Sequence, residues 1–218
     1  MLNVGLRVLV AIALFVGIVF GCAGRWDLPF AWAYLAVLLC VLVTTLIVAD
    51  RDLLQERMKP GPGGSDRKLR FVAAGLFLGH LVVAALDAGR FHWSGSVPVG
   101  LQFAGLAGLA MSMALSVWAL HVNRFFSPVV RIQSERGHCV ITDGPYRWIR
   151  HPGYAAALMS SLCSGPTLGS WWSILVLAPM FVLTIRRTVI EDRYLRERLE
   201  GYVDYAQRVR YRLAPGVW

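Results

Sequence analysis

The chain has 218 residues, of which 56% are hydrophobic, and a net charge of +9 at pH 7. This composition excludes an ordinary soluble domain and is typical of a protein with several membrane-spanning helices. The positive charge has no separate soluble domain to occupy, so nucleic-acid binding is not expected.

Long uncharged stretches predict the membrane spans. They cover residues 8–24, 28–49, 71–86, 91–123 and 152–185. A helix needs about 20 apolar residues to cross a bilayer, so each of the first three stretches predicts one span. The fourth opens with polar residues, glycine and proline, and it predicts a loop followed by one helix over residues 98–122. Residues 8–24 are interpreted as a retained first span, because further spans follow it.

The fifth stretch is too long for one span. As a single helix it would extend about 51 Å, whereas the hydrocarbon core of a bilayer is about 30 Å thick. Gly165-Pro166 and Gly169 lie near its middle and favour a turn. We therefore predict a helical hairpin with arms at residues 152–164 and 169–190, which brings the predicted total to about six spans.

The basic residues predict the orientation. Every Lys and Arg except Arg25 and Arg90 falls in segments that lie on one side of the membrane if both termini are cytoplasmic. The charged segment at residues 186–212 predicts a cytoplasmic C-terminal helix. The chain is therefore predicted to be an all-α polytopic membrane protein, with a four-span scaffold at residues 1–122 and a cofactor-binding and catalytic region at residues 123–218.

The segment GPYRWIRHPGY, residues 144–154, concentrates polar and aromatic side chains beside the predicted hairpin. Pro152 suits the first turn of a helix, which places Arg150 and His151 at the N-terminus of the short arm. Free backbone N–H groups and the helix dipole at such a position favour an anion such as a carboxylate. Other arginines of the preceding loop are interpreted as contacts to lipid phosphates, namely Arg131, Arg136 and Arg147.

Two acids, Glu191 and Asp192, follow the last predicted span. Arg187 lies four residues before Glu191, so an ordinary ion pair along one helix is one interpretation. The other interpretation is that Glu191 faces Arg150 or a cationic cofactor at the mouth of the hairpin. The four cysteines show neither metal-ligand nor disulfide spacing, and no metal site is predicted.

Short motifs follow one another in a characteristic order over the last part of the chain. They are similar to HxLVTxG at residues 138–144, GPY at 144–146, RHPxY at 150–154, EExxL at 191–195 and YxxY at 202–205. Together they resemble the isoprenylcysteine carboxyl methyltransferase family of integral membrane enzymes and its phospholipid methyltransferase relatives. Asp192, Ala156 and Leu199 stand where the family pattern has Glu, Gly and Gly.

The resemblance implies S-adenosylmethionine as the methyl donor, in a cytoplasm-facing pocket formed by the loop, the hairpin and the C-terminal helix. It implies Arg150 and Glu191 as the catalytic pair. The residues that it implies as cofactor contacts are His138, Gly144, Tyr146, His151, Tyr154, Asp192, Tyr202 and Tyr205.

These observations predict an integral membrane methyltransferase that works among membrane lipids on a lipidic or small hydrophobic acceptor. A carboxylate acceptor is ionised at pH 7 and needs no base, whereas an amine or thiol must lose a proton, with Glu191 as the candidate base. Two alternatives are a transporter, which needs polar residues at mid-membrane, and a non-catalytic scaffold, which does not need Arg150 or Glu191. Most basic residues are arginine, which is typical of a GC-rich bacterial genome, so the predicted location is a bacterial inner membrane.

Overall fold

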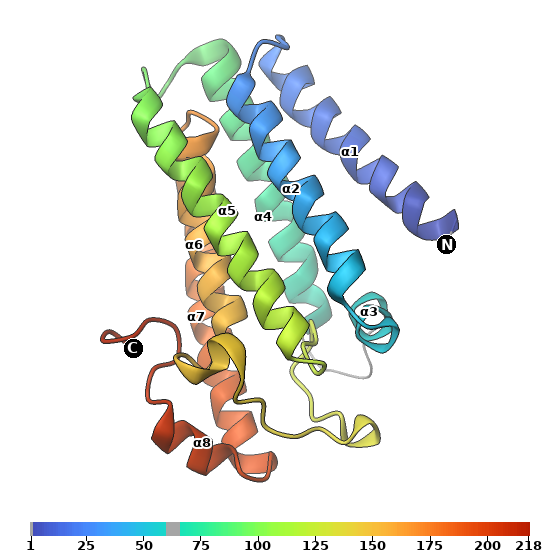
Figure 1. Cartoon of the computed structure of the whole chain (residues 1–218). Coiled ribbons are helices and arrows are strands. Elements are labelled where there is room, and N and C mark those ends of the chain that lie inside the picture. Colours follow the sequence, from blue (N-terminus) through green and yellow to red (C-terminus); the bar gives the residue numbers. More distant parts are fainter. Residues whose placement is uncertain (1, 60–65) are drawn as a thin grey trace. The chain divides into compact units, whose positions relative to one another are not determined.

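The computed structural model describes residues 2–59 and 66–218, and within these ranges it contains helices and connecting segments but no β-strand. The prediction of an all-α fold is therefore confirmed. Figure 1 labels the α-helices in chain order. They are α1 (Leu2–Ala23), α2 (Pro29–Val48), α3 (Arg51–Met58), α4 (Asp66–Leu86), α5 (Val99–Val122), α6 (Pro152–Thr167), α7 (Trp172–Arg198) and α8 (Tyr202–Arg208). Three shorter helices are the π-helix η1 (Asp87–Phe91) and the 3-10 helices η2 (Ser134–Arg136) and η3 (Gly144–Arg147).

Four segments are long and apolar enough to cross a membrane. They are Pro29–Val48, Leu69–Phe91, Val99–Val122 and Trp172–Arg198. The apolar part of α1, Val8–Ala23, is shorter than these four segments, and α6 has 16 residues. Helices thus form at all the predicted spans, but length and composition support four crossings among the described residues. The number six stays a prediction.

The turn of the predicted hairpin lies later in the chain than expected. Pro166 is part of the last turn of α6, where its φ is compatible with a helix and its carbonyl accepts the N–H of Gly169 at 3.0 Å. The break falls at residues 168–171, with Gly169 at φ 76°. A Cβ atom at Gly165 would lie 2.4 Å from Cγ1 of Ile174, so this glycine serves the close approach of α6 and α7 at the turn.

The predicted tail helix at residues 186–212 is wrong in its bounds. α7 runs through the predicted end of the span to Arg198, because a change from apolar to charged residues does not interrupt backbone hydrogen bonding. The helix ends where Gly201 adopts φ 77°, a left-handed conformation that favours glycine. A separate short helix, α8, follows, and its cytoplasmic location stays a prediction.

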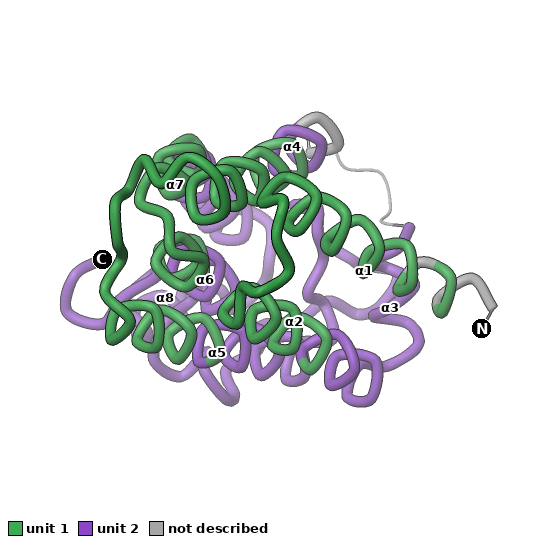
Figure 2. Tube along the Cα trace, turned by 90° about the horizontal axis from the view of Figure 1, so that it is seen from above, with its two compact units in different colours: residues 1–40, 74–110, 160–179 green, residues 41–73, 111–159, 180–218 purple. Residues whose placement is uncertain are grey.

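The chain divides into two compact units, which Figure 2 colours separately. Unit 1 comprises residues 1–40, 74–110 and 160–179, and unit 2 comprises residues 41–73, 111–159 and 180–218. The boundaries fall inside α2, α4, α5, α6 and α7. The division of roles between residues 1–122 and 123–218 concerns function and stays a prediction.

Unit 1 contains a buried histidine with polar partners on both ring nitrogens. His80 Nε2 lies 2.6 Å from the Ser164 hydroxyl, and His80 Nδ1 lies 2.9 Å from the carbonyl oxygen of Ser173. The Ser164 hydroxyl in turn contacts the Tyr34 hydroxyl at 2.9 Å. These contacts link α2, α4, α6 and α7 within unit 1, so the histidine is satisfied by the protein itself.

A buried carboxylate in unit 1 is satisfied in the same way. Asp87 accepts hydrogen bonds from the backbone N–H and hydroxyl of Ser94, at 2.8 and 2.5 Å. It also accepts one from the Ser170 hydroxyl at 2.5 Å. Asp87 therefore ties the π-helix η1 to the turn that joins α6 to α7.

Candidate active site

A cavity of about 510 Å³ lies within unit 2. Helices α3 to α7, the loop between α5 and α6, and α8 all contribute to its wall. Of the residues predicted to form the site, those that line it are His138, Tyr146, Arg150, His151, Tyr154, Glu191, Tyr202 and Tyr205. Gly144 and Asp192 are not part of the wall. The motifs that the sequence analysis singled out therefore converge on one cavity.

Asp192 lies behind the wall and organises it. Its side chain is 2% exposed and accepts hydrogen bonds from four side chains. The donors are Arg150 Nε at 2.7 Å, the Tyr202 hydroxyl at 3.0 Å, Arg212 Nε at 3.1 Å and Arg196 Nε at 3.2 Å. His151 Nε2 also lies 3.4 Å away. A carboxylate with this many donors positions its neighbours, and the cofactor contact predicted for Asp192 stays a prediction.

Arg150 pairs with Asp192, whereas the sequence analysis paired it with Glu191. Nη1 of its guanidinium donates to the carbonyl oxygens of Val209 and Arg210 at 2.6 and 2.8 Å. Nη2 lies 3.3 Å from the second oxygen of Asp192. Of the five N–H donors of a guanidinium, four are thus engaged by protein acceptors. Arg150 is 4% exposed and reaches the cavity with little of its surface.

At the N-terminus of α6, where an anion site was predicted, the backbone N–H groups of Arg150 and His151 are engaged by the protein itself. The backbone N–H of Arg150 donates to the carbonyl of Tyr211 at 3.0 Å, and that of His151 donates to the carbonyl of Arg212 at 2.9 Å. The segment after α8 thus runs along this end of α6 and satisfies these donors. Sequence spacing gave no indication of this contact.

Glu191 faces the cavity and belongs to a second polar group. It accepts the Tyr154 hydroxyl at 2.5 Å, and its side chain is 26% exposed. Arg187 Nε donates to the same hydroxyl at 2.6 Å, and Arg187 Nη2 donates to the carbonyl of Pro128 at 2.6 Å. Arg187 lines the cavity, a position that the sequence did not predict, although its spacing from Glu191 had suggested an ion pair along one helix face.

His138 forms part of the loop side of the wall. Its ring stacks on Phe125 with centroids 4.4 Å apart, and its Nδ1 accepts the backbone N–H of Gln133 at 3.2 Å. Burial, together with the charges of Arg131 and Arg136, lowers the pKa of His138 to about 4. The imidazole is therefore neutral at pH 7, and because Nδ1 is an acceptor, the proton resides on Nε2.

Three tyrosines complete the polar wall. The Tyr146 hydroxyl accepts from Asn123 Nδ2 at 3.0 Å, and the Tyr205 hydroxyl donates to the Tyr146 carbonyl at 2.8 Å. Burial raises the pKa of both phenols, and it raises that of Tyr202 with a further contribution from the charge of Asp192. All three remain neutral hydrogen-bonding groups over the physiological pH range.

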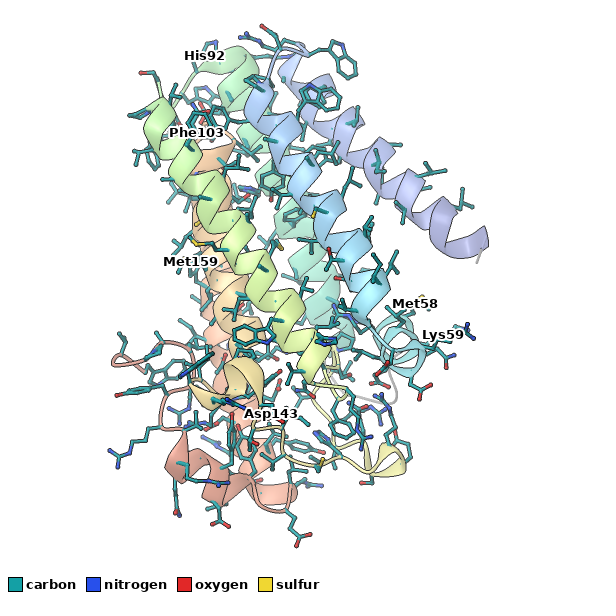
Figure 3. All side chains as sticks on the ribbon, viewed as in Figure 1. Met58, Lys59, His92, Phe103, Asp143 and Met159 are labelled. Atoms are coloured by element: carbon teal, nitrogen blue, oxygen red, sulfur yellow. The ribbon has the colours of Figure 1, made fainter. Side chains whose placement is uncertain are left out.

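Gly144 has a conformational role in this segment. Its φ is 54°, and a Cβ atom there would lie 2.9 Å from Val122 and 3.0 Å from Trp118. Figure 3 labels the preceding residue, Asp143, where the loop enters η3. The glycine thus permits a close packing of η3 on α5, and the cofactor contact predicted for it stays a prediction.

The wall also includes residues that precede the predicted catalytic region. They are Arg57, Leu69, Arg70, Ala73 and Ser116. The guanidinium of Arg57 lies 5.3 Å from the ring centroid of Phe126, and a Cβ atom at Gly153 would lie 2.5 Å from Cζ of that ring. Phe126 is therefore packed between α3 and the start of α6.

Arg131 has protein partners in place of the lipid phosphates predicted for it. It forms ion pairs with Glu56 and Glu135, each at 2.7 Å. Burial by itself would raise the pKa of Glu56, but hydrogen bonds from Arg131 and Ser127 hold it below the usual value. The ion pair between Arg131 and Glu56 connects α3 to the loop that carries His138.

The arrangement of the site accords with the comparisons to known proteins. The sequence model of the isoprenylcysteine carboxyl methyltransferase family matches residues 105–197. The cobalt-zinc-cadmium resistance protein CzcN of Cupriavidus metallidurans is 28% identical over 129 residues, which cover 58% of this chain and 56% of that protein. Protein-S-isoprenylcysteine O-methyltransferase B of Arabidopsis thaliana is 32% identical over 89 residues, 40% of this chain and 45% of the plant protein. Probable protein-S-isoprenylcysteine O-methyltransferases of Oryza sativa are 36% identical over 94 residues, 40% of this chain and 47% of theirs.

The chain spans about half the length of the curated relatives that it matches. The matched residues contain the GPY, RHPxY and EExxL motifs, and Tyr202 and Tyr205 lie beyond them. The four apolar helices and this match together indicate an integral membrane protein. Residues 105–197, less than half of the chain, are similar to the isoprenylcysteine carboxyl methyltransferase family.

Proposed function

We propose that this protein is an integral membrane methyltransferase that uses S-adenosylmethionine to methylate the carboxylate of a lipidic or small hydrophobic acceptor. The observation that carries the proposal is the convergence of the family motifs, separated by up to several dozen residues, on one cavity in unit 2. Its volume of about 510 Å³ falls within the range of about 300–1,000 Å³ that is usual for small-molecule sites.

The side chains of the wall fit this cofactor. When bound, S-adenosylmethionine supplies an electrophilic methyl group on a positively charged sulfur. Glu191 contributes a carboxylate to the wall, and Tyr146, Tyr154 and Phe125 contribute aromatic side chains; carboxylates and aromatic rings both attract a cation. The neutral His138 retains an Nε2–H donor, which suits a carboxylate or an adenine acceptor atom.

The wall also fits an acceptor that combines an acidic head with an apolar body. Arg57, Arg70 and Arg187 are cations in the wall, whereas hydrocarbon comes from other wall residues. These are Leu69, Ala73, Ala157, Met180 and Leu183. A carboxylate acceptor reacts in its ionised form and requires alignment with the methyl group more than proton transfer. Methylation of an amine or thiol remains the alternative, and it would require Glu191 as a base.

Glu191→Gln is the informative test of the chemistry. The substitution keeps the size of a partly exposed side chain and removes its charge, so we expect methyl transfer to fall by orders of magnitude with little change in thermal stability. Membranes are incubated with methyl-labelled cofactor and the lipid extract is counted. Arg147→Gln is the control, because Arg147 is exposed and outside the wall.

Arg150→Gln is a poorer test, because it leaves the buried Asp192 without its nearest cation and lowers stability at the same time. Absence of calorimetric binding of S-adenosylhomocysteine to the wild-type protein at millimolar concentration would refute the proposed cofactor. A transporter or a non-catalytic scaffold would then be the better account of the chain.

The proposal includes the orientation of the site in a bacterial inner membrane. Basic residues of short loops resist translocation, so both termini and the cavity of unit 2 are assigned to the cytoplasm. Reporter fusions at Ser134 and Trp218 are expected to report the cytoplasm, and fusions at Gly95 and Pro166 the opposite side. A cytoplasmic reporter at Pro166 would contradict the hairpin.

A further inference from the structure

Arg187 is the arginine of the wall that contacts the Tyr154–Glu191 pair directly. Arg150 donates its N–H groups to Asp192 and to the carbonyls of residues 209 and 210, away from that pair. Arg187 instead donates from Nε to the Tyr154 hydroxyl, and its guanidinium carbon lies 5.8 Å from the centroid of the Tyr154 ring. Arg187, and not the motif residue Arg150, therefore shares a hydrogen-bond partner with Glu191.

The direction of these hydrogen bonds follows from the chemistry of the groups. An arginine has donors and no acceptor, so the oxygen of Tyr154 must accept from Arg187. The single phenolic proton is then directed to Glu191, whose oxygen lies 2.5 Å away. An ionised carboxylate can only accept, so the order Arg187 to Tyr154 to Glu191 is the one consistent assignment.

A further contact of Arg187 extends this series of hydrogen bonds to the loop side of the cavity. Nη2 donates to the carbonyl of Pro128 at 2.6 Å, within the segment that also carries Phe125 and Phe126. One side chain on α7 therefore fixes a residue of α6 and a residue of the loop, both of which line the cavity.

We propose that Arg187 is a positioning residue that acts through Tyr154: it fixes the phenol so that its proton holds the Glu191 carboxylate in one orientation toward the cavity. This inference rests on the proposed function, because the oriented carboxylate serves the cationic cofactor. Removal of Arg187 frees the hydroxyl to turn, and Glu191 then loses a charge-assisted hydrogen bond of defined geometry.

A double-mutant cycle between Arg187→Gln and Tyr154→Phe tests this inference. The first readout is the Kd of S-adenosylhomocysteine, measured by calorimetry with the full chain in detergent. Each single variant should weaken binding by about tenfold, the lower end for a hydrogen bond to a charged group. The double variant should bind clearly more strongly than the product of the two single losses predicts, because the part of the Arg187 role that runs through the hydroxyl is already lost in Tyr154→Phe. Losses that multiply to about a hundredfold would overturn the inference.

Two further variants separate positioning from a general structural role. Arg187→Lys keeps a cationic donor for Tyr154 but lacks the planar fork that also reaches Pro128, so it should recover part of the affinity. Arg186→Gln removes the exposed neighbouring arginine, which is outside the wall, and should retain wild-type affinity. Equal losses in Arg187→Lys and Arg187→Gln would contradict positioning through the hydroxyl.

The second readout distinguishes failure of this inference from failure of the proposed function. The same cycle is measured as the thermal unfolding midpoint without any ligand, where direct contact between Arg187 and Tyr154 predicts coupling. Coupling in stability together with no cofactor binding by the wild type would refute the proposed function and the positioning role with it. Cofactor binding with additive losses would refute the positioning role alone.

Discussion

Each unit contains a set of buried polar side chains, and the two sets differ in what they face. In unit 1, His80 and Asp87 are at most 1% exposed, and hydroxyl and backbone groups of the same unit satisfy them. Neither lines the cavity of about 340 Å³ that unit 1 contains. In unit 2, Asp192 is equally buried, but His151 and Tyr202, which contact it, belong to the wall of the larger cavity.

This difference shows why buried polarity alone is a poor sign of function in a membrane protein. Ionisable residues within spans are often functional, but they also join helices when serine, tyrosine and backbone groups satisfy them. The polar set of unit 1 is closed on itself, which favours a role in helix packing. The polar set of unit 2 is open to a cavity, which favours a role toward a ligand.

The largest effect is expected from Asp192→Asn, which tests whether unit 2 depends on its buried carboxylate. Arg150 would then be buried without its counter-charge, and such a change typically costs about 3–5 kcal/mol. We expect a large fall in the unfolding midpoint in detergent and loss of cofactor binding. Asp204→Asn is the matched control, since Asp204 is exposed on α8. Similar midpoints for the two variants would show that Asp192 does not organise the site.

His80→Leu is the corresponding change in unit 1, with a smaller expected effect. It removes one hydrogen bond of the Ser164 hydroxyl, which keeps its contact with Tyr34, and one of the Ser173 carbonyl, and a lost hydrogen bond typically costs about 0.5–1.5 kcal/mol. Stability should fall, while the Kd of S-adenosylhomocysteine for the folded protein should be unchanged. A His80→Asn variant can replace one of these hydrogen bonds, so its stability should lie between that of the wild type and that of His80→Leu. Weaker cofactor binding in proportion to lost stability would break the distinction between the units.

The sequence predicted the positions of the long helices but not all of their ends. Uncharged stretches located every long helix, because hydrophobic length is a property of the chain alone. The turn after Pro166 was misplaced, because the fixed φ of proline is helical and its missing N–H removes only one hydrogen bond in the last turn of α6. The end of α7 was misplaced because it depends on Gly201 and not on the change to charged residues.

The roles predicted for the motif residues stay predictions, and the sequence did not indicate their hydrogen-bond partners. Most of the predicted site residues line the cavity, but the motifs could not distinguish Glu191 in the wall from Asp192 behind it. Successive residues of a helix point about 100° apart, so only the structure decides which one faces the cavity. The contact of Arg131 with Glu56 joins positions 75 apart in the chain, and no local pattern predicts it.

Gly153→Ala sharpens the account of the wall, with an effect expected to be smaller again. The new Cβ atom would lie 2.5 Å from Cζ of Phe126, so the ring must move toward Arg57 or into the cavity. Overpacking of this kind costs about 1–3 kcal/mol, and displacement of a wall residue should weaken cofactor binding several-fold. Gly100→Ala is the control, because a Cβ atom at that position meets nothing within 4 Å. Equal affinity in both variants would indicate that Phe126 does not shape the occupied part of the cavity.

The smallest expected effect is a pH dependence that His138 imparts to unit 2. Its pKa in the folded protein is about 4, lowered from 6.5 by burial and then by the charges of Arg131 and Arg136. Between these two values the unfolded chain binds more protons than the folded chain, so stability falls as the pH falls from 6.5 toward 4 and is fully present above that window.

The unfolding midpoint of the wild type in detergent should therefore decrease by a few degrees at most between pH 7.5 and pH 5 on account of this residue. His138→Gln removes the titrating group, so it should show a shallower decrease over the same interval, and its difference from the wild type at pH 7.5 measures the lost packing on Phe125 separately. Identical pH dependence in the two proteins would mean that His138 is not held neutral by its burial in the cavity wall.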